Sequence, residues 1–152
     1  MGWALLLPVG TRPEAVVSCI YAFARRVEPP ALLHLFPSPG TRREAARVAE
    51  AARALLGGVE VLETVVEEAS LLGIVEAARG AIRAARGKGM RVAVDVTTGR
   101  KVMSVALYKA AVEEGADLVL YLHLKCREFE GLLYPLIPAS CVELVALKGE
   151  LP

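Results

Sequence analysis

The sequence is poor in the residues that most often bind metals or stack on ligands. It contains two histidines, His34 and His123, which stand alone, and aromatic residues make up 5% of the chain. No histidine or cysteine cluster has metal-ligand spacing. The 18 basic and 17 acidic residues leave a net charge of +1, which argues against binding to bulk duplex nucleic acid. We therefore expect no metal, no cofactor and no duplex nucleic-acid partner.

Long hydrophobic runs and targeting signals are also missing. The apolar run 3–9 is far too short to span a bilayer, and no basic segment precedes it. We therefore expect no membrane partner. The three cysteines, Cys19, Cys126 and Cys141, lack a CxxC spacing, and we interpret them as free thiols in a reducing cytosol. This interpretation predicts a cytoplasmic protein.

The familiar nucleotide and hydrolase fingerprints are absent. The chain has no G-x-G-x-x-G after its first predicted strand, no G-x-x-x-x-G-K-S/T motif and no G-x-S-x-G elbow. These absences argue against a dehydrogenase, a P-loop NTPase and a serine hydrolase of the elbow type.

What the sequence does contain is a regular alternation of strand-like and helix-like segments. With 152 residues, 55% of them hydrophobic, it has enough apolar material for one domain over residues 1–152. Strands are predicted at 3–7, 31–36, 59–62, 92–95, 118–122 and 142–147, and helices at 13–26, 42–56, 70–86 and 101–114. Residues 126–140 look irregular or form a short helix. The pattern predicts a Rossmann-like α/β three-layer sandwich, with a mainly parallel sheet of about six strands and helices on both faces.

Two predicted loops each join the end of a strand to the start of a helix. The first is 9–12, with Gly10, Thr11 and Arg12, and the second is 97–101, T-T-G-R-K. In a doubly wound sheet their strands are neighbours at the point where the strand order reverses. Together the loops would form one electropositive mouth with two helix N-termini pointing into it, suited to a phosphate.

Arg100 and Lys101 are the strongest local signal for a ligand. Two adjacent cations in a first helical turn oppose the helix dipole, and a local rule broken at one place suggests function there. The neighbouring residues have simpler interpretations. Asp95 at a strand end caps the following turn, and His34 belongs to the core or a sheet edge. Met103 packs in the core or contacts a base, and the tyrosines at 21, 108 and 121 are structural.

The segment from Asp95 to Lys101, D-V-T-T-G-R-K, resembles the motif of the CRISPR-associated Rossmann fold (CARF) family. That family carries a strand ending in D-x-S/T-x-G-x-K followed by an apolar helix, and a short Gly-Ser/Thr turn after its first strand. Gly10 and Thr11 match this turn. Thr98 and Arg100 depart from the commonest residues of the family motif.

The resemblance implies a sensor of cyclic oligoadenylate, with cyclic tetra-adenylate as the first candidate, bound across a homodimer axis. A chain of this length has no room for an effector after Leu147, which implies a stand-alone member or a piece of a longer protein. The resemblance implies that a stand-alone member would act as a ring nuclease, in which a ribose 2′-OH attacks the adjacent phosphate without a metal.

The resemblance also assigns site residues. Lys101 would stabilise the developing charge and Thr11 would orient the reacting groups, so these two are the candidate catalytic residues. The candidate ligand-binding residues come from both loops and the following helix: Gly10, Arg12, Thr97, Thr98, Gly99, Arg100 and Met103.

Two other functions stay open at this point. One is a sensor or sponge that binds the ring without cutting it. The other is an unrelated Rossmann-like domain that binds another nucleotide or a phosphorylated metabolite.

Overall fold

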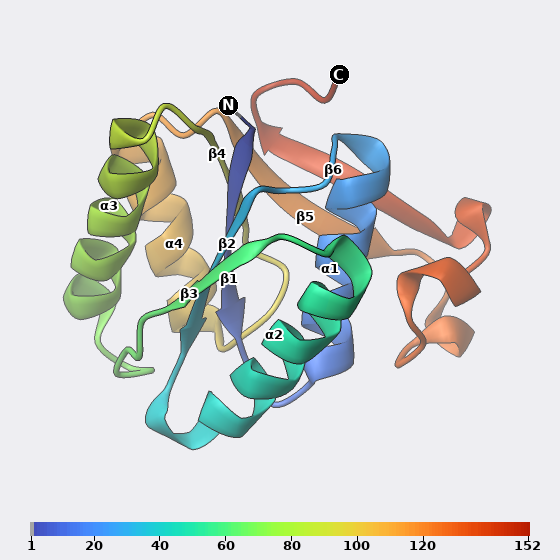
Figure 1. The fold of residues 1–152 in the computed structure, drawn as a ribbon. Coiled ribbons are helices and arrows are strands. Elements are labelled where there is room, and N and C mark those ends of the chain that lie inside the picture. Colours follow the sequence, from blue (N-terminus) through green and yellow to red (C-terminus); the bar gives the residue numbers. More distant parts are fainter. Residues whose placement is uncertain (1) are drawn as a thin grey trace.

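A twisted six-stranded sheet lies at the centre of the structure, a computed structural model that describes residues 2–152. Figure 1 shows helices packed on both of its faces. The strands are β1 (Trp3–Val9), β2 (Leu32–Pro37), β3 (Glu60–Glu63), β4 (Arg91–Asp95), β5 (Leu118–Leu124) and β6 (Val142–Lys148). The helices are α1 (Pro13–Arg26), α2 (Arg42–Leu56), α3 (Leu71–Gly87) and α4 (Lys101–Glu113). Three short 3₁₀ turns, η2 (Arg127–Phe129), η3 (Tyr134–Leu136) and η4 (Ala139–Cys141), occupy the segment before β6.

The order of the strands in the sheet is β3-β2-β1-β4-β5-β6. The first five strands pair in parallel, and β6 pairs with β5 in the antiparallel sense. The order reverses between β1 and β4, which is where ligands bind in open α/β sheets. The predicted fold class, a mainly parallel Rossmann-like sandwich, is confirmed.

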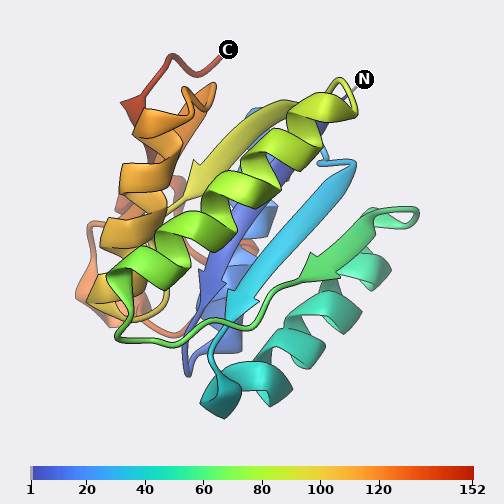
Figure 2. The same cartoon turned by 90° about the vertical axis from the view of Figure 1, so that its left-hand side faces the viewer.

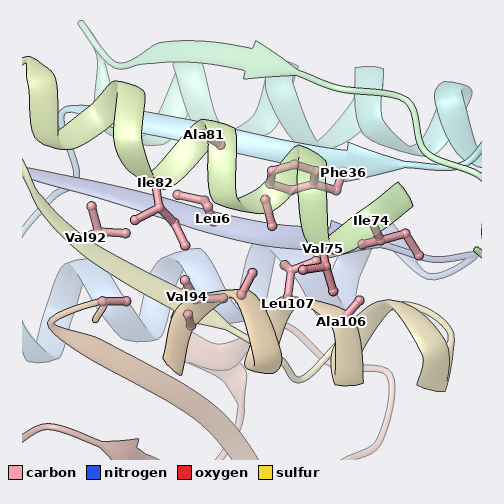
Figure 3. Close-up of a cluster of buried hydrophobic side chains, with 14 of the residues drawn as sticks. Leu6, Phe36, Ile74, Val75, Ala81, Ile82, Val92, Val94, Ala106 and Leu107 are labelled. Atoms are coloured by element: carbon pink, nitrogen blue, oxygen red, sulfur yellow. The ribbon is translucent and has the colours of Figure 1, made fainter. Parts of the chain in front are cut away.

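The two faces of the sheet are covered by different pairs of helices. Figure 2 shows α3 and α4 on one face, with α1 and α2 behind the sheet. On the α3–α4 side, Leu6 and Val94 of the central strands pack against Ile82 and Leu107, as Figure 3 shows. Every residue of β1 is buried, because both of its faces are covered. This double coverage explains why the central strands are unbroken apolar runs.

The cysteine interpretation is wrong for two of the three residues. Cys126 and Cys141 form a disulfide with a Cα–Cα distance of 5.1 Å, whereas Cys19 is free and buried. The pair forms because β6 returns antiparallel beside β5, which brings the two ends of the intervening segment together. Within residues 2–152 no helix is both long enough and apolar enough to cross a membrane.

The disulfide should stabilise the fold by closing the segment between its two cysteines. Replacing both, in a Cys126→Ser/Cys141→Ser variant, should lower the free energy of unfolding by about 3 kcal/mol, because the unfolded chain regains the conformational entropy that a cross-link over a loop of this size removes. Urea denaturation with and without dithiothreitol measures the effect. Reductant should destabilise the wild type and a Cys19→Ser control but leave the double variant unchanged. A wild type that is indifferent to reductant would contradict the prediction.

Candidate functional site

The two predicted loops meet backbone to backbone at the carboxyl ends of β1 and β4. A Cβ added to Gly10 would lie 3.0 Å from the Cα of Gly99. Gly99 has a φ of +84°, and a Cβ there would lie 2.9 Å from the Cβ of Pro8. Both positions therefore require glycine, one for close approach and the other for its left-handed backbone as well. The sequence prediction that these loops converge is confirmed in its geometry.

The threonine hydroxyls of the second loop build the junction. The Thr98 hydroxyl is buried and donates to the carbonyl of Pro8 at 2.7 Å, which ties the second loop to the end of β1. The Thr97 hydroxyl accepts a hydrogen bond from the Leu122 N–H at 2.8 Å, which ties the loop to β5. From the sequence, both residues were predicted to bind the ligand. Their hydroxyls are engaged with the backbone, so the contacts they offer a ligand are mainly through the loop backbone.

A cleft of about 660 Å³ opens directly over this junction. Its size falls within the range of about 300–1,000 Å³ that is usual for small-molecule sites. The structure brings most of the sequence-predicted site residues into its wall: Gly10, Thr11, Arg12, Thr97, Thr98, Gly99, Arg100 and Met103. Met103 is almost fully buried, so it forms part of the floor.

Lys101 is the exception among the predicted residues. It is the first residue of α4 and is exposed, but it does not line the cleft of this single chain.

One wall of the cleft was not found from the sequence. The disulfide-closed segment 126–141 contributes Phe129, Glu130, Leu132 and Ile137 to the lining. It is attached to α1 by the Tyr134 N–H, which donates to the Ser18 hydroxyl at 3.0 Å. In sequence this stretch is an irregular run with prolines, and its position depends on the return of β6 beside β5.

The cleft is less electropositive than the sequence suggested. Its lining includes two arginines, Arg12 and Arg100, and three glutamates, Glu14, Glu68 and Glu130. The Arg12 guanidinium lies 3.1 Å from Glu14 and 3.4 Å from Glu130. The Arg100 Nε lies 3.6 Å from Glu68. The prediction of an electropositive mouth is therefore wrong, because both of its arginines are paired with carboxylates of the same chain.

Both helices that start at the cleft have open N-termini. Neither Arg12 before α1 nor Arg100 before α4 makes a side-chain capping hydrogen bond. The first N–H groups of a helix have no intrahelical partner, and they carry a partial positive charge. α1 offers fewer such donors than α4, because its first residue, Pro13, has no N–H and the Ala15 N–H donates to the Arg12 carbonyl. Donors of this kind at one opening suit an anionic ligand.

Asp95 is buried beneath the second loop, and its carboxylate caps the turn of that loop. One carboxylate oxygen accepts a hydrogen bond from the Thr97 N–H at 2.9 Å, as expected of a turn cap. The other has no hydrogen-bond partner within residues 2–152. Burial raises the pKa of Asp95 to about 6, although its contacts with Thr97 act in the opposite direction. The buried thiol of Cys19 lies beside it, and burial raises the pKa of that thiol well above its usual value.

The two histidines stay outside the cleft lining. His34 is buried in β2, where its Nε2 lies 2.8 Å from the Thr64 hydroxyl and its ring stacks on Phe36. Burial lowers its pKa to about 4. This placement agrees with the interpretation of His34 as a core histidine. Within residues 2–152 no group of three His, Cys, Asp or Glu side chains is arranged to hold a metal ion.

Solved structures of other proteins share this fold. Can2 from Sulfobacillus thermosulfidooxidans, solved in complex with cyclic tetra-adenylate, matches 78% of this chain with a TM-score of 0.65 and 13% identity. A type III CRISPR defence DNA nuclease activated by cyclic oligoadenylate matches 82% of it with a TM-score of 0.65 and 23% identity. The protein VC1899 from Vibrio cholerae matches 78% with a TM-score of 0.65 and 8% identity.

At these identities the likeness establishes the fold. The chain corresponds to 31%, 19% and 30% of the lengths of Can2, the DNA nuclease and VC1899, so it spans about a third of each or less. No model of a protein family matches the sequence, and no curated protein matches it either.

The buried carboxyl of Asp95 predicts a pH dependence of stability. Its pKa is about 6 in the folded protein against its ordinary value of 3.8, so the folded state binds its proton more tightly. Its contribution to stability is present below pH 4 and lost as the pH rises through 6, by about 3 kcal/mol. His34, whose pKa is lowered on folding, acts in the opposite direction over the same range.

The two effects can be separated by comparing the wild type with Asp95→Asn, which keeps an oxygen for the Thr97 N–H. Urea denaturation at several pH values from 4 to 7.5 should show the variant gaining on the wild type by about 3 kcal/mol as the pH rises. Parallel pH profiles for the two proteins would rule out a buried, proton-binding Asp95.

Proposed function

We propose that this chain is a CARF-type domain that binds cyclic oligoadenylate, with cyclic tetra-adenylate as the first candidate, and cleaves it. The observation that carries the proposal is the junction of Gly10 and Gly99, where two loops and two open helix N-termini share one cleft. The fold shared with Can2, which was solved with cyclic tetra-adenylate, adds support. The proposal includes a cytoplasmic location, for which the cysteines no longer argue because two of them form a disulfide, and neither duplex nucleic acid nor a membrane as partner.

The ligand's phosphates would lie at the loop junction. The glycines let the backbone approach a phosphate closely, and the N–H groups at the starts of α1 and α4 supply donors. Arg12 and Arg100 line the cleft on the two loops, and a guanidinium can contact a phosphate with two parallel hydrogen bonds. The rest of the lining, which includes Phe129 and Leu132, offers apolar surface for a base.

A homodimer is proposed from the outer face of α4. Val105, Tyr108 and Val112 follow one another at helical spacing and are 58%, 43% and 45% exposed. Tyr121 on β5 is also exposed, at 39%. A contiguous apolar stripe on a helix is typical of a contact with another molecule. A second copy of the chain is the binding partner of this stripe that would also complete the cleft.

That occupant is favoured by the position of Lys101. Lys101 lies four residues before Val105, so it heads the same stripe on α4, next to the loop that lines the cleft. If two copies pack through this stripe, both lysines lie at the interface beside both clefts. A two-fold pocket of this kind suits a ring with an even number of nucleotides.

The proposed reaction is an internal transesterification. The ribose 2′-oxygen attacks the adjacent phosphorus, the bond from phosphorus to the 5′-oxygen breaks, and a 2′,3′-cyclic phosphate and a 5′-hydroxyl result. The 2′-OH proton leaves to water and the 5′-oxygen gains one. The protein would hold the attacking and leaving oxygens in line and stabilise the extra negative charge, with Thr11 and Lys101 in these roles.

A non-catalytic sensor or sponge is the second candidate function. It is favoured by the position of Lys101 outside the cleft lining of one chain and by the lack of a histidine in that lining. A binding module needs only the loops, the arginines and the dimer, all of which the enzyme also needs. Catalysis is therefore the part of the proposal that depends on Lys101.

The two candidates are separated by incubating the protein with labelled cyclic tetra-adenylate in EDTA. Linear products support the enzyme, whereas an unchanged ring with tight binding supports the sensor or sponge. Calorimetry that detects no heat with any cyclic oligoadenylate would overturn both and favour another nucleotide or phosphorylated metabolite.

Two substitutions test the catalytic roles. Lys101→Ala should slow single-turnover cleavage by about 10²- to 10³-fold while weakening ring binding less, because it removes charge stabilisation from the transition state. Thr11→Ala should slow cleavage by about tenfold, the effect of one lost hydrogen bond. Equal turnover in the Lys101 variant would remove this residue from the mechanism, and an unchanged rate in the Thr11 variant would assign it to packing.

The dimer is tested at the α4 stripe. Tyr108→Glu should convert the dimer to a monomer in analytical ultracentrifugation, because it places a charge in an apolar contact, and ring binding should weaken with it. Leu55→Glu introduces the same charge at an exposed leucine on α2, on the opposite face of the sheet, and should leave the dimer intact. A wild type that sediments as a monomer at micromolar concentration, with or without the ring, would contradict the proposed interface.

A further inference from the structure

Each arginine of the cleft forms an ion pair with a glutamate from a segment that is distant in sequence. Glu130, on the disulfide-closed segment, lies 3.4 Å from the Nη1 of Arg12 at the start of α1. Glu68, in the loop between β3 and α3, lies 3.6 Å from the Nε of Arg100 before α4. Each glutamate lines the same cleft as the arginine that it contacts. The carboxylates therefore lie on the two guanidinium groups that are best placed to hold phosphates.

Local structure does not explain these two glutamates. Glu14, the third carboxylate in the lining, lies in the first turn of α1, where a negative charge stabilises the helix dipole. Glu68 and Glu130 lie outside the helices α1–α4. Their ion pairs are at least half exposed on the arginine side, and exposed pairs of this kind contribute little to folding stability.

Building on the proposed function, we propose that Glu68 and Glu130 set the affinity and selectivity of the cleft by occupying the places of two ligand phosphates. Binding then exchanges a carboxylate for a phosphate at Arg100 and at Arg12. A ligand with a single phosphate displaces one carboxylate and remains close to the others, which repel it. A ligand that presents two phosphates across the cleft satisfies both arginines at once. The cleft thus selects anions with several spaced phosphates.

The exchange predicts that removing a negative charge improves binding. Glu130→Gln and Glu68→Gln should each bind cyclic tetra-adenylate about three- to tenfold more tightly than the wild type, measured by calorimetry at fixed ionic strength. Glutamine keeps the size and one acceptor of glutamate, so the change is chiefly one of charge. A misfolded variant would bind more weakly, so a gain in affinity cannot result from misfolding.

The chain offers a matched control for each variant. Glu128→Gln and Glu67→Gln remove the same charge from exposed residues that do not line the cleft, two positions and one position away. These controls should bind the ring within about twofold of the wild type. If the glutamates serve instead to hold the cleft walls together, Glu130→Gln and Glu68→Gln should bind more weakly than their controls, and the exchange is then wrong.

Inorganic triphosphate, which has several phosphates but no base or ring, separates this inference from the proposed function. The exchange is supported if Glu130→Gln and Glu68→Gln bind triphosphate more tightly than their matched controls, even where no protein binds cyclic tetra-adenylate. Tighter binding of triphosphate without any binding of cyclic tetra-adenylate would overturn the proposed function but not the exchange. The exchange is overturned if neither probe binds these two variants more tightly than the controls.

Discussion

The site depends on one contact, the approach of Gly10 to Gly99 across the central pair of strands. The 3.0 Å separation between a Cβ built on Gly10 and the Cα of Gly99 leaves no space for a side chain on Gly10, and the Cβ of Pro8 leaves none on Gly99. The Thr98 hydroxyl locks the approach by bonding to the carbonyl of Pro8. Because the loops touch here, the helices that follow them start at the same opening. Both arginines and both sets of free N–H groups owe their positions to this contact.

The sheet explains why residues so far apart in sequence meet. β1 and β4 are parallel neighbours, so their carboxyl ends lie at the same edge, and the helices after them leave on opposite faces. This divergence opens the cleft between them. The antiparallel strand β6 adds the third wall, because it brings the segment 126–141 back over α1. The cleft is thus bounded by the loops after β1 and β4 and by the disulfide-closed segment 126–141.

The elements that local patterns specify could be predicted from the sequence. The predicted helices 13–26 and 42–56 have the same bounds as α1 and α2, and the other helices and the strands differ from the prediction by one or two residues at their ends. Their apolar spacing and their Gly or Pro boundaries depend only on nearby residues. The convergence of the two loops was also predictable, because alternating strands and helices leave few topologies.

The parts that could not be predicted depend on long-range contacts. Nothing in the spacing of Cys126 and Cys141 indicates a disulfide, because their approach follows from the turn of β6. The pairing of Arg12 with Glu130 joins residues 118 positions apart, and local charge patterns say nothing about it. Likewise, Thr97 and Thr98 suggested ligand contacts, but their hydroxyls meet the backbone of other strands.

The central place of β1 has a consequence for how the protein acquires its site. The first strand to be synthesised pairs with β2 soon afterwards, but its other edge stays open until β4 is made, about 90 residues later. Contacts with such large sequence separation form late, since a long loop must close before they stabilise anything. The junction of Gly10 and Gly99 can therefore form only after β4 has been made and paired with β1. A fragment that ends before β4 would contain only the first of the two loops, and one edge of β1 would be exposed. An exposed strand edge can pair with another chain and so promotes aggregation.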